Sequence, residues 1–184
     1  QNLRACNACP LGWSGNQFIP VYDRCQSCPR GKHGTMLNAT TLSEGCQNCT
    51  SGTFSDVEAL ETNVGCKGCP KGKWSSSIGA TKESECINCG TGKYGPNNVG
   101  ANDESLCSNC GQGRFLDMVG SFGNEKCLSC PIGFVQNVTG QAFCLPCTPG
   151  KFSHQEGRSE CMDCAVGKAS SDVARKIDCD VCDK

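Results

Sequence analysis

The sequence predicts a small disulfide-rich fold of mostly β and irregular structure, an elongated tandem repeat of about nine hairpin-like units with no helices of note. Three observations predict it. The chain has 20 Cys among 184 residues, a density typical of disulfide scaffolds. Every Cys belongs to a CxxC pair, and the pairs recur every 17 to 21 residues, as in stacked repeat arrays. Leu, Ile, Val and Phe number 31, too few for one continuous core.

The CxxC pairs set the domain organisation. We expect the end of a preceding repeat at 1–8 and the start of a following one at 182–184, so the chain is expected to be a piece of a longer protein. It begins with Gln1 and carries neither an initiator Met nor a signal-peptide core. The nine complete repeats, numbered 1 to 9 throughout, are 9–27, 28–48, 49–68, 69–88, 89–109, 110–129, 130–146, 147–163 and 164–181.

Each repeat is expected to begin with a turn, because a Gly follows the second Cys of the pair by three residues. Gly accepts the positive φ that some tight turns require, and Pro often precedes it, as in Cys69-Pro70-Lys71-Gly72. The nine turn glycines are Gly12, Gly31, Gly52, Gly72, Gly92, Gly113, Gly133, Gly150 and Gly167.

A basic residue and then an aromatic follow this turn in many repeats. Because strand side chains alternate between faces, we expect the aromatic to cover the disulfides and the basic residue to face water. The basic residues are Lys32, Lys73, Lys93, Arg114, Lys151 and Lys168, and the aromatics are Phe54, Trp74, Tyr94, Phe115 and Phe152. Trp13 and Phe134 come one place early, and His33 and Ala169 stand at the aromatic position, so repeats 1, 2, 7 and 9 are expected to pack less regularly.

A second turn is expected in mid-repeat, at Gly79-Ala80 and its counterparts, followed by a return strand into the next CxxC. Acidic residues near the end of that strand are expected to face the basic position across the hairpin. They are Asp23, Glu44, Glu85, Glu104, Glu125, Glu160 and Asp178.

These motifs resemble the ephrin-receptor-like cysteine-rich repeat, which reads CxxC-Pro-x-Gly-x-aromatic-Ser, then Gly-Ala or Gly-Ser, then a polar run into the next CxxC. Repeat 4, from Cys69-Pro70-Lys71-Gly72-Lys73-Trp74-Ser75 through Gly79-Ala80 to Cys86, carries the resemblance best. The chain is similar more loosely to the cysteine-rich modules of tumour necrosis factor receptors. The resemblance implies spacing, adhesion or ligand contact outside the cell.

Two disulfide connectivities remain open. In the ladder, the second Cys of each pair bonds the first Cys of the next, leaving Cys6 and Cys182 at the ends. In the alternative, interlocked modules bond first to third and second to fourth within successive groups of four, which uses all 20 Cys. A peptide linking Cys69 to Cys89 would rule out the ladder. The ladder is Cys9–Cys25, Cys28–Cys46, Cys49–Cys66, Cys69–Cys86, Cys89–Cys107, Cys110–Cys127, Cys130–Cys144, Cys147–Cys161 and Cys164–Cys179.

Other uses of CxxC fit less well. The spacing overlaps that of zinc ribbons, yet the Cys are used uniformly and His contributes nothing, so no metal is expected. Thioredoxin-like redox chemistry needs one reactive site in a βαβ context. His33 and His154 lie near no free nucleophile in the sequence, and acidic pairs such as Glu83 with Glu85 are interpreted as solvated charge. The chain is therefore predicted not to be an enzyme.

The cysteine usage predicts an extracellular or cell-surface location reached through the secretory pathway. Sequons at Asn38, Asn137 and Asn48 predict N-linked glycans, with Cys at the middle position of the Asn48 sequon, and no other cofactor is expected. The formal net charge of −1 predicts no nucleic-acid partner. Without an apolar run of membrane-spanning length, no direct membrane insertion is expected.

Two functions fit this description. The first is a stiff disulfide-stapled rod or stalk in a cell-surface, matrix or filament-forming protein, with copies of itself or other extracellular proteins as partners. A stripe of Lys73, Lys93 and Arg114 also makes acidic polysaccharide a candidate partner. The second is a ligand-binding receptor ectodomain. Its candidate contacts are Trp13, Phe18, Ile19, Tyr22, Phe134, Val135 and Phe143.

Overall fold

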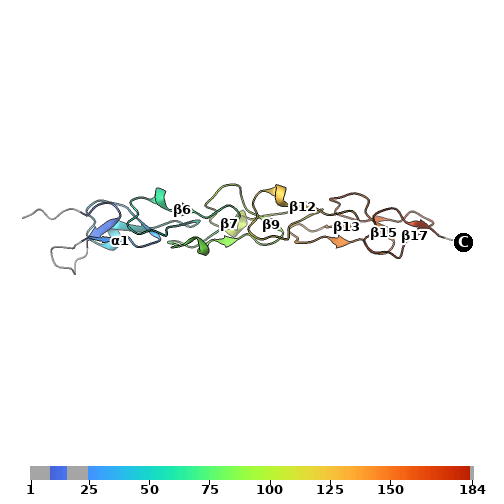
Figure 1. The fold of residues 1–184 in the computed structure, drawn as a ribbon, viewed down its shortest axis with the longest axis horizontal. Coiled ribbons are helices and arrows are strands. Elements are labelled where there is room, and N and C mark those ends of the chain that lie inside the picture. Colours follow the sequence, from blue (N-terminus) through green and yellow to red (C-terminus); the bar gives the residue numbers. More distant parts are fainter. Residues whose placement is uncertain (1–8, 16–24, 183–184) are drawn as a thin grey trace, which may run out of the picture. The chain divides into compact units, whose positions relative to one another are not determined.

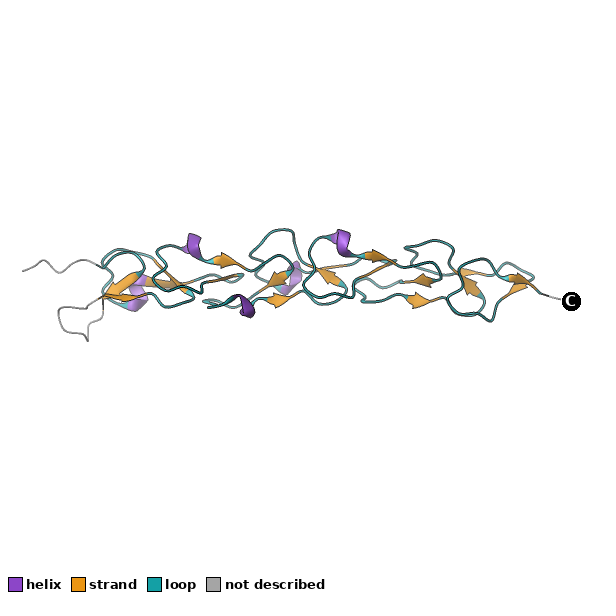
Figure 2. Ribbon diagram, in the orientation of Figure 1, coloured by secondary structure: helices purple, strands orange, loops and turns teal. Residues whose placement is uncertain are grey.

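The computed structural model of the chain describes residues 9–15 and 25–182. They form two compact units. The first contains the described residues up to Ile87 together with Asn98–Glu104, and the second contains Asn88–Asn97 together with the described residues from Ser105 onward. Each unit consists of small hairpins whose short strands are joined by longer loops (Figures 1 and 2). The tandem disulfide-rich fold predicted from the sequence is thereby confirmed.

The strands are two or three residues long, and their antiparallel pairs join the start of a repeat to its end. In the first unit the pairs are β1 (Trp13–Gly15) with β2 (Cys25–Ser27), β3 (Lys32–Gly34) with β4 (Cys46–Asn48), and β5 (Thr53–Phe54) with β6 (Lys67–Gly68). Strand β7 (Lys73–Trp74) also belongs to this unit, and β8 (Ile87–Asn88) lies where the chain passes to the second.

The second unit repeats the same pairing five times. Its pairs are β9 (Lys93–Tyr94) with β10 (Ser108–Asn109), β11 (Arg114–Phe115) with β12 (Leu128–Ser129), β13 (Phe134–Val135) with β14 (Leu145–Pro146), β15 (Lys151–Phe152) with β16 (Met162–Asp163), and β17 (Lys168–Ala169) with β18 (Asp180–Val181).

Helices contribute little to the described residues, as the sequence predicts. The single α-helix, α1 (Leu42–Gly45), is four residues long, and Thr41 caps its N-terminus by accepting a hydrogen bond from the Glu44 N–H. Four 3₁₀ turns occupy the matching part of later repeats: η1 (Asn63–Gly65), η2 (Glu83–Glu85), η3 (Glu104–Leu106) and η4 (Asn124–Lys126). The polar run before each CxxC therefore forms a helical turn in these repeats.

The return strand is shorter than the sequence suggests and lies within the CxxC itself. In repeat 6, for example, Phe115 pairs with Leu128 and Arg114 with Ser129, the two residues between Cys127 and Cys130. The expectation of a return strand made from the preceding polar run was wrong. In repeats 3 to 6 a 3₁₀ turn of three residues ends the polar run, and the CxxC completes the hairpin.

The disulfides follow the ladder. Each joins the second Cys of one pair to the first Cys of the next and closes one hairpin, with Cα atoms 5.4 to 5.8 Å apart. Cys69 is bonded to Cys86, the first Cys of the next pair, whereas the interlocked alternative would bond it to the second Cys of another pair. Cys182 is a free, exposed thiol, and Cys6 lies outside the described residues.

The apolar clusters are small and are built on these disulfides. One consists of Phe54, Cys69, Ala80 and Cys86, so the Phe54 ring of repeat 3 packs on the disulfide of repeat 4. In the second unit, Leu116 is buried between Cys110 and Cys127, and Tyr94 of repeat 5 packs against them. The aromatic covers a disulfide as expected, but the disulfide belongs to the following repeat.

Candidate functional site

The features that recur along the described chain lie at the junctions between successive repeats. Three main-chain hydrogen bonds join repeat 3 to repeat 4. The N–H of Gly52 donates to the carbonyl of Ser75 (2.7 Å), the N–H of Ser55 donates to Ala80 (3.0 Å), and the N–H of Gly79 donates back to Cys49 (2.8 Å). Repeat 4 is thus held by both its first strand and its mid-repeat turn.

The same three bonds recur in the second unit. Between repeats 6 and 7, Gly113 donates to Gln136 (2.7 Å), Leu116 to Gln141 (3.1 Å) and Gly140 to Cys110 (2.9 Å). The side chains at these positions differ from those of repeats 3 and 4. The bonds can still form, because they use only backbone N–H and C=O groups. The junction therefore tolerates sequence change, provided the backbone can approach.

A residue directly after the aromatic position is the centre of each junction. In repeats 3, 4 and 8 it is Ser55, Ser75 and Ser153, each at 1% exposure. Its carbonyl accepts from the preceding repeat, and its N–H donates to the following one. The Ser55 hydroxyl also donates to the carbonyl of Val57 (3.1 Å), which stabilises the bend that follows. Sequence reasoning assigned these residues no role, although the recurring Ser signals it.

Several of the turn glycines make a further contact that skips one repeat. All nine have positive φ, between 72° and 88°. A Cβ atom placed on Gly113 of repeat 6 would lie 2.6 Å from the carbonyl carbon of Gly157 in repeat 8. The corresponding atom on Gly52 would lie 2.9 Å from the carbonyl carbon of Gly100. These turns therefore need Gly both for conformation and for close backbone approach.

In three repeats the residue before the second Cys of a pair is an Asn that packs on the repeat two further along the chain. Its side chain lies against the glycine of the mid-repeat turn of that repeat. Asn48 lies against Gly79. In the second unit Asn88 contacts Gly120, and Asn109 contacts Gly140, in the same way. This set was not identified from sequence, although Asn at this CxxC position is visible at the ends of repeats 2, 4 and 5.

Trp13 and Phe134 do not disturb the register of their hairpins. Trp13 pairs with Ser27, and Phe134 pairs with Pro146, which is the pairing that Lys151 makes with Asp163 in repeat 8. The expectation of irregular packing in repeats 1 and 7 was wrong at these strands. The two aromatic side chains simply occupy the place that a basic residue has elsewhere.

The basic residues after the turn were expected to face acidic residues across the hairpin, and some of them do. Lys168 pairs with Asp178 as expected, and this hydrogen bond is the main cause that holds the pKa of Asp178 below its usual range. Lys73 instead pairs with Glu83 (3.2 Å), and Lys151 pairs with Asp163. The acidic partners differ because the polar run turns before the return strand begins.

Glu44 and Glu85 bond their own turns rather than a basic residue across the hairpin. The carboxylate of Glu85 accepts hydrogen bonds from the backbone N–H and the hydroxyl of Thr81, both at 2.9 Å. Glu44 accepts the same two bonds from Thr40. These bonds favour the ionised carboxylates and lower the pKa of both groups from their ordinary value of 4.5.

This arrangement predicts a pH dependence. Because the pKa of Glu85 is lowered by folding, its contribution to stability is present above the ordinary pKa and is lost as the pH falls through the folded value. We expect NMR titration of the Glu85 carboxyl carbon to give a midpoint below 4.5 and Thr81→Val to raise it. Glu85→Gln should reduce stability at pH 7, and this effect should disappear once the pH is low enough to protonate Glu85 in both the folded and the unfolded chain. A titration midpoint unchanged by Thr81→Val would contradict this role.

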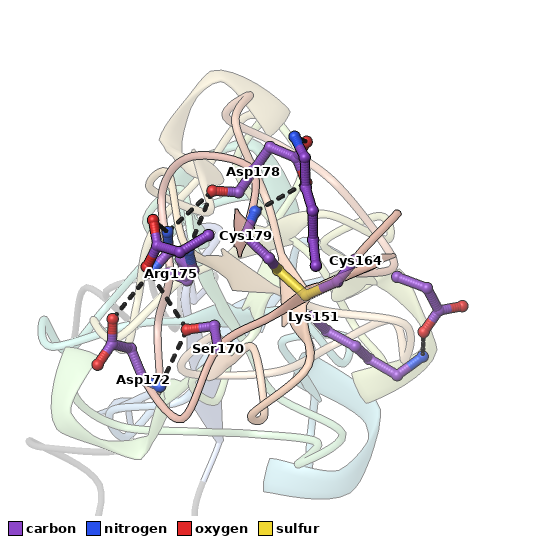
Figure 3. The surroundings of a disulfide bond; sticks show 10 residues. Lys151, Cys164, Ser170, Asp172, Arg175, Asp178 and Cys179 are labelled. Carbon is purple, nitrogen blue, oxygen red and sulfur yellow. Dashed lines mark hydrogen bonds and ion pairs between the residues drawn. A yellow bond between two sulfur atoms is a disulfide. The ribbon is translucent and has the colours of Figure 1, made fainter. Parts of the chain in front are cut away.

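Repeat 9 carries a buried guanidinium where repeats 4 and 5 have a buried Ala. Arg175 follows the mid-repeat turn, the position of the buried Ala80 in repeat 4. Its Nη1 contacts the carboxylate of Asp172 (2.9 Å), and its Nη2 contacts that of Asp180 (2.8 Å) and donates to the carbonyl of Asp178 (2.9 Å). Figure 3 shows this network beside the Cys164–Cys179 disulfide. It fixes the loop of repeat 9 by polar contacts.

Other sequence candidates lie as follows. Within residues 9–15 and 25–182 no group of three or more His, Cys, Asp and Glu side chains is placed to hold a metal ion. The same residues include no helix with the length and apolar character of a membrane span. His33 is buried, with Nδ1 2.9 Å from the Gly34 carbonyl. In the proposed basic stripe, Lys73 is ion-paired, and Arg114 donates to the Cys127 carbonyl (3.4 Å).

The ligand-contact candidates are distributed over two repeats. Phe143 is 60% exposed and Trp13 is 36% exposed, whereas Phe134 and Val135 are half-buried in β13. Phe18, Ile19 and Tyr22 lie outside the described residues, as does Asp23.

A comparison with protein-family models gives one match. The model described as tyrosine-protein kinase ephrin type A/B receptor-like matches residues 34–86 and 122–164, which together make up just over half of the chain. The matched segments begin and end within the hairpins described above and contain their CxxC pairs, turn glycines and junction residues. A search of curated proteins found no match.

Proposed function

Since the chain belongs to the tyrosine-protein kinase ephrin type A/B receptor-like family, we propose that this extracellular disulfide-rich module acts as a stiff rod or stalk. The parent would be a cell-surface, matrix or filament-forming protein, and the partners are further copies of the chain or other extracellular proteins. The proposal assigns the chain no catalysis, no nucleic-acid partner and no insertion into a membrane.

The observation that carries the proposal is the repeated set of backbone hydrogen bonds at the junctions. Each hairpin is closed covalently and is then bonded to the next by main-chain groups at both its first strand and its mid-repeat turn. Bending such a junction would break hydrogen bonds that lie between backbones and have no flexible side chain to absorb the movement. Repetition of this junction favours stiffness over a chain of loosely tethered beads.

Small-angle X-ray scattering of the oxidised chain tests the proposal. We expect the scattering of a thin rigid rod, with a cross-section that stays constant as repeats are added in longer fragments of the parent protein. Negative-stain images of native material should show straight particles. A flexible coil or a rounded particle in both measurements would contradict the rod.

The second candidate is a ligand-binding receptor ectodomain, which the exposed Phe143 favours. An aromatic ring at 60% exposure beside a disulfide is a typical anchor for a protein partner. Phe143→Ser would then abolish binding to cells or to a protein ligand and leave the scattering profile unchanged. Met118→Ser, at a residue of 57% exposure in repeat 6, is the matched control and should preserve binding. Acidic polysaccharide remains a further candidate partner of the basic residues.

A further inference from the structure

Repeat 7 is the only one of the nine repeats that contains no charged side chain. Residues 127–150, which include it, have no Asp, Glu, Lys, Arg or His. Its exposed side chains include Val138, Phe143 and Leu145, and Phe143 is 60% exposed. These three residues, called the repeat 7 face from here on, therefore combine exposed apolar groups with an absence of charge in their own hairpin.

We propose that the repeat 7 face binds a second copy of the chain, with repeat 7 of one copy against repeat 7 of the other. The inference rests on the first proposed function, in which copies of the chain are partners, and it names the surface that they use. Two observations carry it, namely the buried side chain that holds the loop of repeat 7 and the absence of charge.

A buried amide holds the loop that carries Val138 and Phe143. The Gln136 side chain is 2% exposed, and its Oε1 accepts the N–H of Val138 (3.0 Å) while its Nε2 donates to the carbonyl of Phe143 (2.8 Å). From repeat 6, Nε2 of Gln112 donates to the carbonyl of Asn137 (2.7 Å). Because the loop is already held by these bonds, a partner binds it with little further loss of conformational freedom.

Repeat 8 has Ser153 at the position of Gln136, and its hydroxyl donates to the carbonyl of Gln155, two residues further on (3.0 Å). A hydroxyl has a single donor, so Ser can fix the bend but cannot also bond the end of the loop. The longer amide of Gln136 bonds both the bend, at Val138, and the backbone of Phe143. The residue that is specific to repeat 7 is therefore bonded to the backbone of its most exposed ring.

The absence of charge favours a second copy as the partner. A two-fold contact places a surface patch against the same patch, so a charge near the axis would face its own kind at a cost in binding energy. Exposed aliphatic side chains of other repeats, such as Ile78 and Val119, lie within four residues of charged ones, here Lys82 and Asp117. Repeat 7 has no such charge, and an exposed aromatic without neighbouring charge is typical of the centre of an interface.

A predicted glycosylation site lies in the same loop. Asn137 is exposed and directly precedes Val138, so a bulky glycan on its amide would stand beside the repeat 7 face. We therefore expect a chain that carries this glycan to associate more weakly than the Asn137→Gln chain from the same cells. Equal association of the two would overturn the placement of the contact at this loop.

Sedimentation velocity of the oxidised Asn137→Gln chain, from about 1 to about 500 µM, tests the proposal. Cys6 and Cys182 are replaced by Ser so that no disulfide links the copies. We expect a reversible dimer, which Phe143→Ser should weaken by about 30-fold or more. Val64→Ser, at a residue of 90% exposure in the charged repeat 3, is the control and should leave the dimer unchanged. A monomer at every concentration would overturn the proposal, whereas rod-like scattering of that monomer would leave the rod standing.

A pair of charge substitutions tests whether repeat 7 meets repeat 7. Val138→Lys and Val138→Glu should each weaken the dimer, because the same charge then stands on both copies. An equimolar mixture of the two variants should associate more strongly than either variant alone, since Lys on one copy faces Glu on the other. The same two substitutions at Val64 should have no effect, alone or mixed. A Val138 mixture that associates no better than its components would overturn the symmetric contact.

Gln136→Ser tests the positioning role of the buried amide. The substitution installs the residue of repeats 3, 4 and 8 and keeps the backbone bond from the Gly113 N–H to the carbonyl of residue 136. It should weaken the dimer by about 5-fold to 10-fold, while amide exchange at Gly113 stays unchanged. A dimer as strong as that of the parent chain would overturn this role, as would a loss of protection at Gly113 that accounts for the weaker dimer.

A different protein on the same face is the remaining outcome. If the chain stays monomeric while Phe143→Ser abolishes its binding to cells or to a protein ligand, the face belongs to another partner. That result would overturn the second copy as occupant and would support the receptor ectodomain instead.

Discussion

Replacing Gly113 with Ala should destabilise repeats 6 to 8 by at least about 3 kcal/mol. Two costs add at this position. An L-residue at a φ of 72° costs about 1 to 2 kcal/mol, and the new Cβ would overlap the carbonyl of Gly157 two repeats away. The overlap cannot be relieved by a side-chain rotation, because both groups belong to the backbone. Native-state hydrogen exchange of the peptides around Gly113 and Gly157 measures the change in free energy.

Gly150 provides the matched control. It has the same position in repeat 8, a φ of 80° and the same junction bond, from its N–H to the carbonyl of Ser170 (2.9 Å). No atom beyond its chain neighbours lies within 4 Å of a Cβ placed there. Gly150→Ala should therefore cost only the conformational term of about 1 to 2 kcal/mol. Equal losses at Gly113 and Gly150 would show that the contact between alternate repeats has no energetic weight.

Removing the Cys110–Cys127 disulfide by a double substitution to Ala should cost about 3 to 5 kcal/mol. The two residues are 17 apart, and the bond limits the freedom of the unfolded loop between them. The disulfide also forms two sides of the cluster that buries Leu116 and supports Tyr94. Because repeat 6 bonds to both its neighbours, we expect faster amide exchange in repeats 5, 6 and 7.

The Cys164–Cys179 disulfide is the comparison for this prediction. Its loop is similar, with a separation of 15 residues, but repeat 9 is also fixed by the Arg175 network (Figure 3). Replacing Cys164 and Cys179 with Ala should accelerate amide exchange mainly within repeat 9. The acceleration should be smaller than that caused by replacing Cys110 and Cys127. If the loss of Cys164–Cys179 accelerated exchange more strongly and in more repeats than the loss of Cys110–Cys127, the junction hydrogen bonds would not be what stabilises neighbouring repeats.

The local chemistry of each repeat could be predicted from the sequence. The turn after the CxxC requires Gly and is marked by Gly in every repeat, and the mid-repeat turn is marked by Gly79, Gly100 and Gly120. The number and spacing of the Cys pairs indicate a series of small hairpin-like repeats, although they leave the disulfide connectivity open. These features depend on residues within a few positions of each other, where turn geometry and loop closure dominate.

The contacts between repeats could not be predicted from the sequence. Nothing local distinguishes Gly113, which faces another backbone, from Gly150, which faces open space. For the same reason the Phe54 ring was expected to cover a disulfide, but the sequence did not show that this would be the disulfide of repeat 4. Glu85 was assigned to a strand because a three-residue helical turn leaves no periodic pattern, and its carboxylate instead bonds Thr81.

The central claim is that covalent cross-links, and not buried hydrocarbon, keep each hairpin folded. Amide hydrogen exchange of the chain before and after complete reduction at neutral pH tests it most directly. We predict that the junction amides of Gly52 and Gly113 are protected in the oxidised chain and exchange at the rate of an unfolded peptide once all disulfides are reduced. Protection of those amides that survives full reduction would contradict the claim.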